Sequence, residues 1–158
     1  DAREIVAELH GLVLAAIASP HANYVVQKVI EMMPSAVSGF VAEELAGRAA
    51  AMARHRFGCR IFCRLLEHSI TQSSATSALI NECLECAEDL CRHAFGHYVM
   101  KAVLEHGTPE QRARVTEAIR TGPPARSNAA GSPMAEEGSG LMRNAVHRNA
   151  SYVLEKAL

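Results

Sequence analysis

Tryptophan is absent from this sequence, and aromatic residues make up only 4% of its 158 positions. Sandwiches and barrels of β-strands are rich in aromatic and β-branched residues, whereas this chain is 49% hydrophobic with abundant Ala, Leu and Val. The scarcity of aromatic residues therefore favours packed helices.

Long hydrophobic runs are also missing. The longest, Leu12 to Ala18, is too short to cross a bilayer. No signal-peptide pattern is recognisable in a chain that begins at Asp1. We expect no membrane partner and a cytoplasmic location.

Patterns that carry catalysis are lacking as well. The sequence shows no glycine-rich phosphate loop, no suitable pair of carboxylates, and no nucleophile with a base and an orienting group. We therefore predict no enzyme, no cofactor and no small-molecule substrate.

Cysteine occurs five times, an odd number that favours reduced thiols in an intracellular protein over a disulfide framework. Cys83 and Cys86, with Cys91 and His93 nearby, are the nearest approach to a zinc pattern. A second CxxC or HxxxH at finger spacing is missing, and buried helical positions explain the cysteines, so we predict no metal site.

One segment occurs four times, at residues 21–31, 57–67, 95–105 and 149–158. Equivalent positions are Asn23, Cys59, His97 and Ser151, which lie 36, 38 and 54 residues apart. A period of 20–50 residues is typical of solenoids, in which each repeat buries its apolar face against its neighbours.

Apolar periodicity and Gly/Pro punctuation predict a recurring three-helix rhythm. The expected helices are 3–18 (with a division at Gly11), 20–33, 36–45, 47–54, 57–70, 74–85, 86–93, 95–106 and 109–120. Residues 121–140 are rich in Gly, Pro and Ser, which predicts a flexible inserted loop and explains the long last step. The expected organisation is a single solenoid over 1–158, with repeats near 5–40, 41–78, 79–120 and 139–158.

Each repeated segment places two polar residues one helical turn apart with a planar residue beside the first, as in Asn23, Tyr24 and Gln27. The apolar positions Val25, Val26, Val29 and Ile30 are expected to face inward. Two polar side chains can hydrogen-bond a base edge while the planar one stacks on the base, so this pattern predicts binding of single-stranded RNA.

Charge is distributed unevenly despite a net value of −1. The net charges of the four repeated regions are 0 for 19–31, +3 for 52–68, +1 for 92–106 and +2 for 143–158. The remaining residues therefore carry a net charge of −7. This predicts one basic and one acidic wall. Chance clustering of charges on solvated faces is the alternative.

The sequence resembles the Pumilio/Puf family of RNA-binding repeat proteins. The resemblance lies in His55-Arg-Phe-Gly-Cys-Arg-Ile, Tyr98-Val-Met-Lys-Ala-Val-Leu-Glu-His-Gly107 and His147-Arg-Asn-Ala-Ser-Tyr-Val-Leu-Glu-Lys156. It covers all four repeated segments, which look like the fourth to seventh repeats of an eight-repeat member. It implies an all-α, armadillo-like α-solenoid, a right-handed superhelix of three-helix repeats that reads one base per repeat.

The outer two repeats match the family's recognition code fully. The resemblance assigns uracil to Asn23, Tyr24 and Gln27, and guanine to Ser151 and Glu155 with Tyr152 as the stacking residue.

The middle two repeats depart from the code. Cys59 and Arg60 match an adenine pattern, but Cys63 stands where Gln is expected. The third repeat keeps its stacking ring and departs at both edge positions, with His97, Tyr98 and Lys101; Lys101 only donates, which favours a carbonyl-bearing base or a phosphate. Because the family's RNA runs antiparallel to the protein, the expected core is 5′-G-N-A-U-3′.

The family's biology implies recognition of messenger RNA 3′ untranslated regions for translational repression, with repressor or deadenylase-complex proteins on the outer face. Two alternatives are a protein-interaction scaffold of helical repeats and a nucleolar, low-selectivity factor in ribosome assembly.

Several residues also have local alternatives. The three tyrosines are candidates for core-edge aromatics, and Asn23 and Ser151 for helix N-caps. The arginines beside Cys59 and Cys63 are candidates for activating a redox thiol. The recurring His55, His93 and His147 suggest a structural role between stacked repeats.

Overall fold

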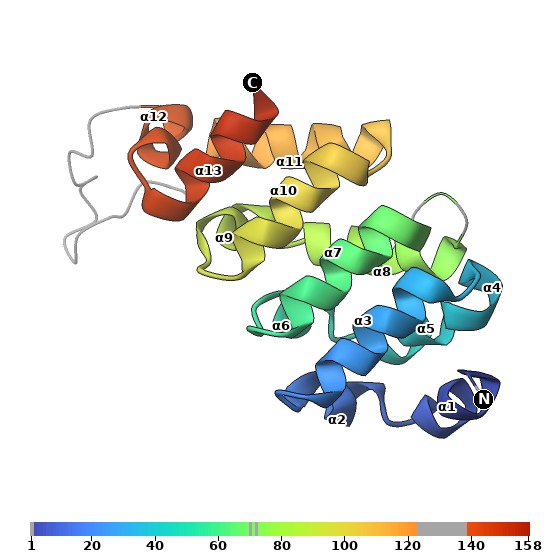
Figure 1. Ribbon diagram of the computed structural model, residues 1–158. Coiled ribbons are helices and arrows are strands. Elements are labelled where there is room, and N and C mark those ends of the chain that lie inside the picture. Colours follow the sequence, from blue (N-terminus) through green and yellow to red (C-terminus); the bar gives the residue numbers. More distant parts are fainter. Residues whose placement is uncertain (1, 70, 72, 123–138) are drawn as a thin grey trace.

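The computed structural model describes residues 2–69, 71, 73–122 and 139–158, and every regular element among them is a helix (Figure 1). The helices are α1 (Ala2–Leu9), α2 (Val13–Ala18), α3 (Ala22–Met32), α4 (Ser35–Ser38), α5 (Phe40–Leu45), α6 (Ala49–Ala53), α7 (Gly58–Ser69), α8 (Ser74–Leu84), α9 (Ala87–Arg92), α10 (Gly96–His106), α11 (Pro109–Thr121), α12 (Gly140–Ala145) and α13 (Arg148–Ala157). None of these helices is long and apolar enough to span a bilayer.

The helices form three rows that run along the molecule (Figure 1). The repeated segments form α3, α7, α10 and α13, here called the motif helices, and each packs against the next. Before each lies a short lead-in helix (α2, α6, α9 or α12), and α5, α8 and α11 form an outer row. The predicted all-α solenoid is confirmed.

Helix boundaries follow local chemistry. Gly11 and Gly47 adopt φ values of 77° and 75°, which favour glycine, and each ends the turn before a lead-in helix. Thr108 caps α11 in a capping box with Gln111, as the Thr-Pro pair predicts. One expected helix, 36–45, is instead divided at Gly39 into α4 and α5.

The apolar core runs continuously through the repeats. In α7, for example, two adjacent pairs of side chains are fully buried: Ile61, Phe62, Leu65 and Leu66. The prediction for α3 is wrong at one position, because Val25 is 43% exposed while Val26, Val29 and Ile30 are buried. Val25 lines a shallow hollow on α3 together with Tyr24, Gln27, Lys28 and Glu31.

In the two middle repeats, the glycine that opens the repeated segment is required for close packing. A methyl group on Gly58 would lie 2.2 Å from the carbonyl oxygen of Met52 in the lead-in helix. On Gly96 it would lie 2.6 Å from a methyl group of Leu90. The start of each of these two motif helices therefore rests directly on the preceding helix.

Polar contacts tie each outer helix to the lead-in helix of its own repeat. The Glu44 carboxylate accepts hydrogen bonds from the backbone N–H groups of Gly11 (2.7 Å) and Val13 (3.2 Å). Glu82 does the same for Gly47 (2.8 Å) and Ala49 (2.9 Å). A carboxylate is favourable there because the first amides of a helix lack intrahelical partners.

The fourth repeat is held to the third by amide side chains. The buried Asn144 donates to the Ile119 carbonyl (2.9 Å) and accepts from Arg92 (3.0 Å). Asn149 donates to the backbone carbonyl of Arg92 (2.9 Å). These bonds link segments that are far apart in sequence.

The expected loop at 121–140 lies outside the described residues over 123–138; its end residues belong to α11 and α12. The backbones on either side of it meet, since a Cβ atom on Gly122 would lie 2.8 Å from the carbonyl oxygen of Gly140. Residues 122 and 140 thus lie side by side, and α11 packs against α12.

We expect Gly58→Ala to lower the free energy of unfolding by about 1–3 kcal/mol, because the added methyl group collides with backbone. Gly39→Ala is the matched control: its methyl group would meet only the Ser35 carbonyl oxygen, at 3.1 Å. Denaturant unfolding monitored by circular dichroism measures both. Equal effects of the two substitutions would contradict the close-approach explanation.

Candidate nucleic-acid interface

Planar side chains project from the row of motif helices. Tyr24, Tyr98 and Tyr152 are 57%, 52% and 46% exposed, and Arg60 occupies the equivalent exposed position of α7. The tyrosines are therefore not part of the core. Because the motif helices pack side by side, these four residues follow one another along a single face of the molecule.

The first polar position of each segment lies deeper than the planar residue beside it. Asn23, Cys59 and His97 are buried, and Ser151 is half-buried. Their polar atoms contact the backbone of the preceding turn: Cys59 Sγ lies 3.5 Å from the Arg56 carbonyl and Ser151 Oγ 3.0 Å from that of Arg148. This position is at the start of the helix, where the chain turns onto its lead-in helix.

In the first repeat the two polar residues are joined. The Asn23 amide group donates to the carbonyls of Ser19 (2.8 Å) and Pro20 (3.0 Å), and its oxygen accepts from Gln27 Nε2 (3.0 Å). Both Asn23 amide hydrogens are used, while Gln27 retains its second amide hydrogen and its oxygen. The pair is thus held in place and still offers a donor and an acceptor.

The second polar position becomes more accessible along the chain. Gln27 is 8% exposed, Cys63 and Lys101 are half-buried, and Glu155 is exposed. Cys63 Sγ lies 3.8 Å from the Tyr98 carbonyl oxygen, and Lys101 Nζ lies 5.8 Å from the centre of the Tyr152 ring. The second position of one repeat therefore approaches the planar residue of the next.

Hollows lie between successive planar residues. One of about 570 Å³ lies among α3, α7 and α10 and is lined by Tyr24, Gln27, Arg56, Cys59, Arg60, Cys63, Arg64, Phe95 and Tyr98. Another of about 480 Å³ lies between α10 and α13, lined by residues that include His97, Tyr98, Lys101, Arg148 and Tyr152. Nine of the twelve predicted residues line these two hollows. Asn23 reaches the first hollow through its bond to Gln27, while Ser151 and Glu155 lie on α13 beside Tyr152.

His97 has a specific place in the second hollow. Its ring centre is 4.0 Å from that of Tyr98 and 6.0 Å from that of Tyr152. Its Nδ1 lies 3.0 Å from the His93 carbonyl oxygen, so the neutral ring donates from Nδ1 and leaves Nε2 as an acceptor. An aromatic ring thus supports Tyr98 from the protein side.

The recurring histidines hold the start of the motif helices. His55 Nδ1 accepts from the N–H groups of Phe57 and Gly58 (both 3.2 Å), and His93 from those of Phe95 (3.1 Å) and Gly96 (3.2 Å). His147 accepts from the equivalent pair, at 3.3 and 3.4 Å. The structural role is thus within a repeat, at the helix start, rather than between repeats.

These contacts also decide the N-cap alternatives. Asn23 and Ser151 lie inside α3 and α13, so neither is the capping residue. In the first repeat the capping position belongs to Ser19, whose hydroxyl accepts from His21 (3.3 Å) and Ala22 (3.1 Å). Sequence reasoning missed Ser19. Its spacing could have revealed it, because Ser19 lies four residues before Asn23, just as each histidine lies four residues before the first polar residue of its repeat, here called the first reader.

The redox alternative is wrong for Cys59 and Cys63. Burial raises the pKa of Cys59, and it raises the pKa of Cys63 to about 12, with smaller opposing effects from Arg60 and Arg64 respectively. Desolvation outweighs the guanidinium groups, so neither thiol is activated. Among the described residues, no group of three or more metal ligands gathers in one place.

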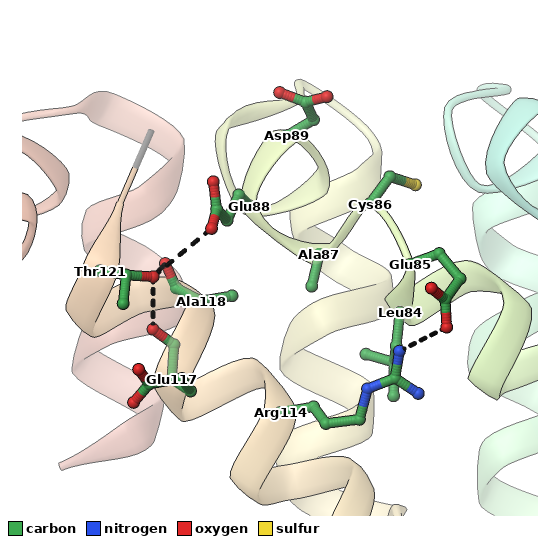
Figure 2. Close-up of a pocket in the computed structure, with 10 residues that line it drawn as sticks. All are labelled: Leu84, Glu85, Cys86, Ala87, Glu88, Asp89, Arg114, Glu117, Ala118 and Thr121. Atoms are coloured by element: carbon green, nitrogen blue, oxygen red, sulfur yellow. Dashed lines mark hydrogen bonds and ion pairs between the residues drawn. The ribbon is translucent and has the colours of Figure 1, made fainter. Parts of the chain in front are cut away.

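Charge separates between the two sides as predicted. A hollow of about 490 Å³ is lined by α9, α11 and the end of α8, with Glu85, Glu88, Asp89, Glu117 and Arg114 among its lining residues. Figure 2 shows Glu85 beside Arg114 and Glu88 beside Thr121. Arg114 pairs with Glu85 (2.8 Å), and the Thr121 hydroxyl bonds the Glu117 carbonyl (2.8 Å). The hollow among the motif helices instead contains three arginines and no carboxylate. Of these two hollows, the one among the motif helices favours a polyanion.

Two contributors to this face were not predicted. Arg56 and Phe95 both line the larger hollow, and Arg56 lies 4.8 Å above the Phe57 ring. Arg56 precedes Arg60 by one helical turn, which is the sequence signal for its position.

Comparison with protein families finds four copies of the Pumilio-family RNA binding repeat, at residues 19–46, 48–75, 86–120 and 145–158, more than half of the chain. Comparison with curated protein sequences finds no match.

Solved structures provide the remaining comparisons. The chain is similar to the Puf3 RNA binding domain bound to a Cox17 RNA 3′ UTR recognition sequence, with a TM-score of 0.77 and 28% identity over 98% of this chain and 40% of that one. For PUF-8 in complex with PBE-RNA, the TM-score is 0.80 and the identity 23%, over 98% of this chain and 40% of that one. For yeast Puf5p bound to MFA2 RNA, the TM-score is 0.73 and the identity 15%, over 98% of this chain and 39% of that one. The chain thus spans about two fifths of the length of these solved chains.

We expect Cys59, Cys63, Cys83 and Cys91 to resist a thiol reagent at pH 7.5 in the folded protein, because burial raises the pKa of each. At a pKa of about 12, only about three thiols in 100,000 are ionised at that pH. Absorbance with a chromogenic disulfide measures the rate, and the unfolded protein, in which all five should react, is the control. Rapid modification of Cys63 in the folded state would contradict the burial described above.

Proposed function

The chain belongs to the Pumilio family of RNA-binding repeat proteins, and we propose that it binds single-stranded RNA selectively along the face formed by α3, α7, α10 and α13. The observation that carries the proposal is the row of exposed planar side chains with polar hollows between them. Bases stack on such side chains, and polar groups within the hollows select among base edges.

For the first repeat we propose uracil. The fixed Asn23–Gln27 pair offers a donor and an acceptor beside the exposed Tyr24 ring. Uracil presents adjacent carbonyl and N–H groups, which this pair complements.

For the fourth repeat we propose guanine. Glu155 is exposed on α13 one turn after Ser151, with Tyr152 available for stacking. A carboxylate accepts two hydrogen bonds, and the guanine edge is the one that presents two adjacent N–H donors.

We propose that the second and third repeats discriminate less strongly among bases. Arg60 is positioned to stack on adenine, but Cys59 and Cys63 are poor hydrogen-bonding groups with raised pKa values. In the third repeat, Lys101 donates only, which favours a carbonyl oxygen or a phosphate. With RNA antiparallel to the protein, the proposed core is 5′-G-N-A-U-3′.

We further propose that the natural target is a messenger RNA 3′ untranslated region and that the outcome is repression in the cytoplasm. Similarity to Puf3, crystallised with such a sequence, supports this target class. The acidic outer hollow at α9 and α11 is a candidate surface for repressor proteins.

The fourth repeat can be converted into a copy of the first. We expect Ser151→Asn with Glu155→Gln to change the preferred base at the first core position from G to U, by about tenfold in Kd. Fluorescence anisotropy with UGUAUAUA and single-base variants, at constant salt because phosphate contacts depend on salt, measures this change.

RNA altered at the N position serves as the control for that swap and should bind both proteins alike. Equal, weak binding of every RNA would favour the ribosome-assembly alternative. Failure to bind any RNA would favour a protein-interaction scaffold.

Stacking of a base on a planar side chain can be tested separately from hydrogen bonding to the base edge. We expect Tyr98→Ala to raise the Kd by about 5- to 150-fold, which corresponds to about 1–3 kcal/mol for one base. Tyr98→Phe keeps the ring and should bind within about twofold of the original chain. Because Tyr98 is half exposed, circular dichroism should show both variants folded. Equal affinity of the two variants would argue against stacking at this position.

A further inference from the structure

The histidine contacts suggest a function beyond holding the fold together. We propose that His93 and His147 are positioning residues for base reading, and that the third and fourth repeats read RNA only while these two rings are neutral. This inference rests on the RNA-binding function proposed above.

Each of the two histidines is bonded to the base reader that follows it. The His93 carbonyl accepts from the backbone N–H of His97 (3.2 Å) and lies 3.0 Å from its ring Nδ1. The His147 carbonyl accepts from the N–H of Ser151 (2.9 Å). Movement of the capping residue is therefore transmitted directly to the first reader of its repeat.

The rings can act only in one protonation state. Nδ1 of each ring accepts two backbone N–H groups, so the single proton of the neutral imidazole is on Nε2. A second proton on Nδ1 removes the acceptor and leaves two backbone donors unpaired. It also places a positive charge at the N-terminus of α10 or α13, where the helix dipole disfavours one.

The surroundings oppose protonation as well. Arg54 and His97 face His93, and Arg54 itself lies 3.8 Å from Asp89. Arg92 faces His147 and donates to Asn144, which is uncharged. Burial first, and then these positive groups, lower the pKa of both histidines below the ordinary value.

The lowered pKa values of His93 and His147 determine how stability changes with pH. Unfolded histidine has a pKa of about 6.5, so the capping contribution is complete above that pH and is lost as the pH falls through the lower folded values. Acidification should therefore loosen the third and fourth repeats.

Simple electrostatics predicts the opposite change for RNA binding. Protonated histidines add positive charge to a face that binds a polyanion, which would tighten binding at low pH. Loss of base selectivity on acidification therefore distinguishes positioning from charge attraction.

The first repeat supplies an internal control. Its capping residue, Ser19, accepts the same two N–H groups through a hydroxyl that does not titrate in this range. The residue before it is Ala18, whereas Arg54 and Arg92 precede His55 and His93, the capping residues of the second and third repeats. Reading of the base opposite Tyr24 should thus be independent of pH.

The experiment compares the 158-residue chain with its His93→Ser/His147→Ser variant, which copies the Ser19 cap. Anisotropy titrations at constant ionic strength between pH 7.5 and 5.5 would use UGUAUAUA, an RNA with the core G replaced, and one with the core final U replaced. For the original chain we expect the preference for G to fall as the pH is lowered, by up to about tenfold at the acid end of this range, the scale of one lost helix cap, with the preference for U retained. The double variant should keep both preferences across the range.

A fall in G selectivity that is equal in both proteins, or unchanged selectivity in the original chain, would overturn the inference. Should the variant fail to fold, an NMR titration of the imidazole Cε1–H signals in the original chain decides. Protonation of His93 and His147 with normal pKa values, or without movement of the Gly96 and Ala150 amide signals, would also overturn it. If no RNA binds at pH 7.5, the proposed function fails and this inference fails with it; normal RNA selectivity at pH 7.5 with no pH effect removes the inference alone.

Discussion

The contact between each motif helix and its lead-in helix is the constraint on which the rest of the structure depends. The first turn of α7 and of α10 approaches the preceding helix so closely that Gly58 and Gly96 have no room for a methyl group. That approach brings the unpaired amides of the first turn next to the residue four positions before the reader. One ring nitrogen or hydroxyl then satisfies two donors that would otherwise lack partners.

The same constraint explains why the first polar residue of each repeat is buried or half-buried while the planar residue beside it is exposed. Asn23 and His97 point back toward the turn, where backbone carbonyls accept their hydrogens. The next residue in the helix is rotated by about 100° and faces outward. Each repeat therefore combines a fixed polar group with an accessible ring, an arrangement that limits the entropy lost when a base stacks.

Outside the motif helices, acidic side chains have two distinct roles. Glu44 and Glu82 use their carboxylates on backbone amides of lead-in helices, whereas the acidic groups around Arg114 remain on the outer hollow. Between the motif helices, ion pairs join Arg64 to Glu31 and Lys156 to Glu105, both at 3.2 Å. The equivalent position between α7 and α10 is Ala102, which leaves the packing of these two helices to apolar contacts. Exposed ion pairs contribute little, so the apolar row dominates the alignment.

The sequence by itself determined the helical class, the four-fold recurrence and the identity of the twelve candidate residues, because repetition at a near-constant spacing requires equivalent positions to occupy equivalent places. Several helix ends were predictable from glycine, proline or a capping pair, as at Gly11, Pro34 and Thr108, although the division at Gly39 was not predicted. Their proposed bases remain predictions from resemblance. Only the tertiary structure decided how deeply each side chain is buried and in which direction it points. Periodicity placed Val25 inward, yet the neighbouring helices leave it exposed and instead bury the polar Asn23. Burial is set by which helices pack alongside, and hydrogen bonds such as those of Ser19 and the histidines form only after that packing brings donor and acceptor together.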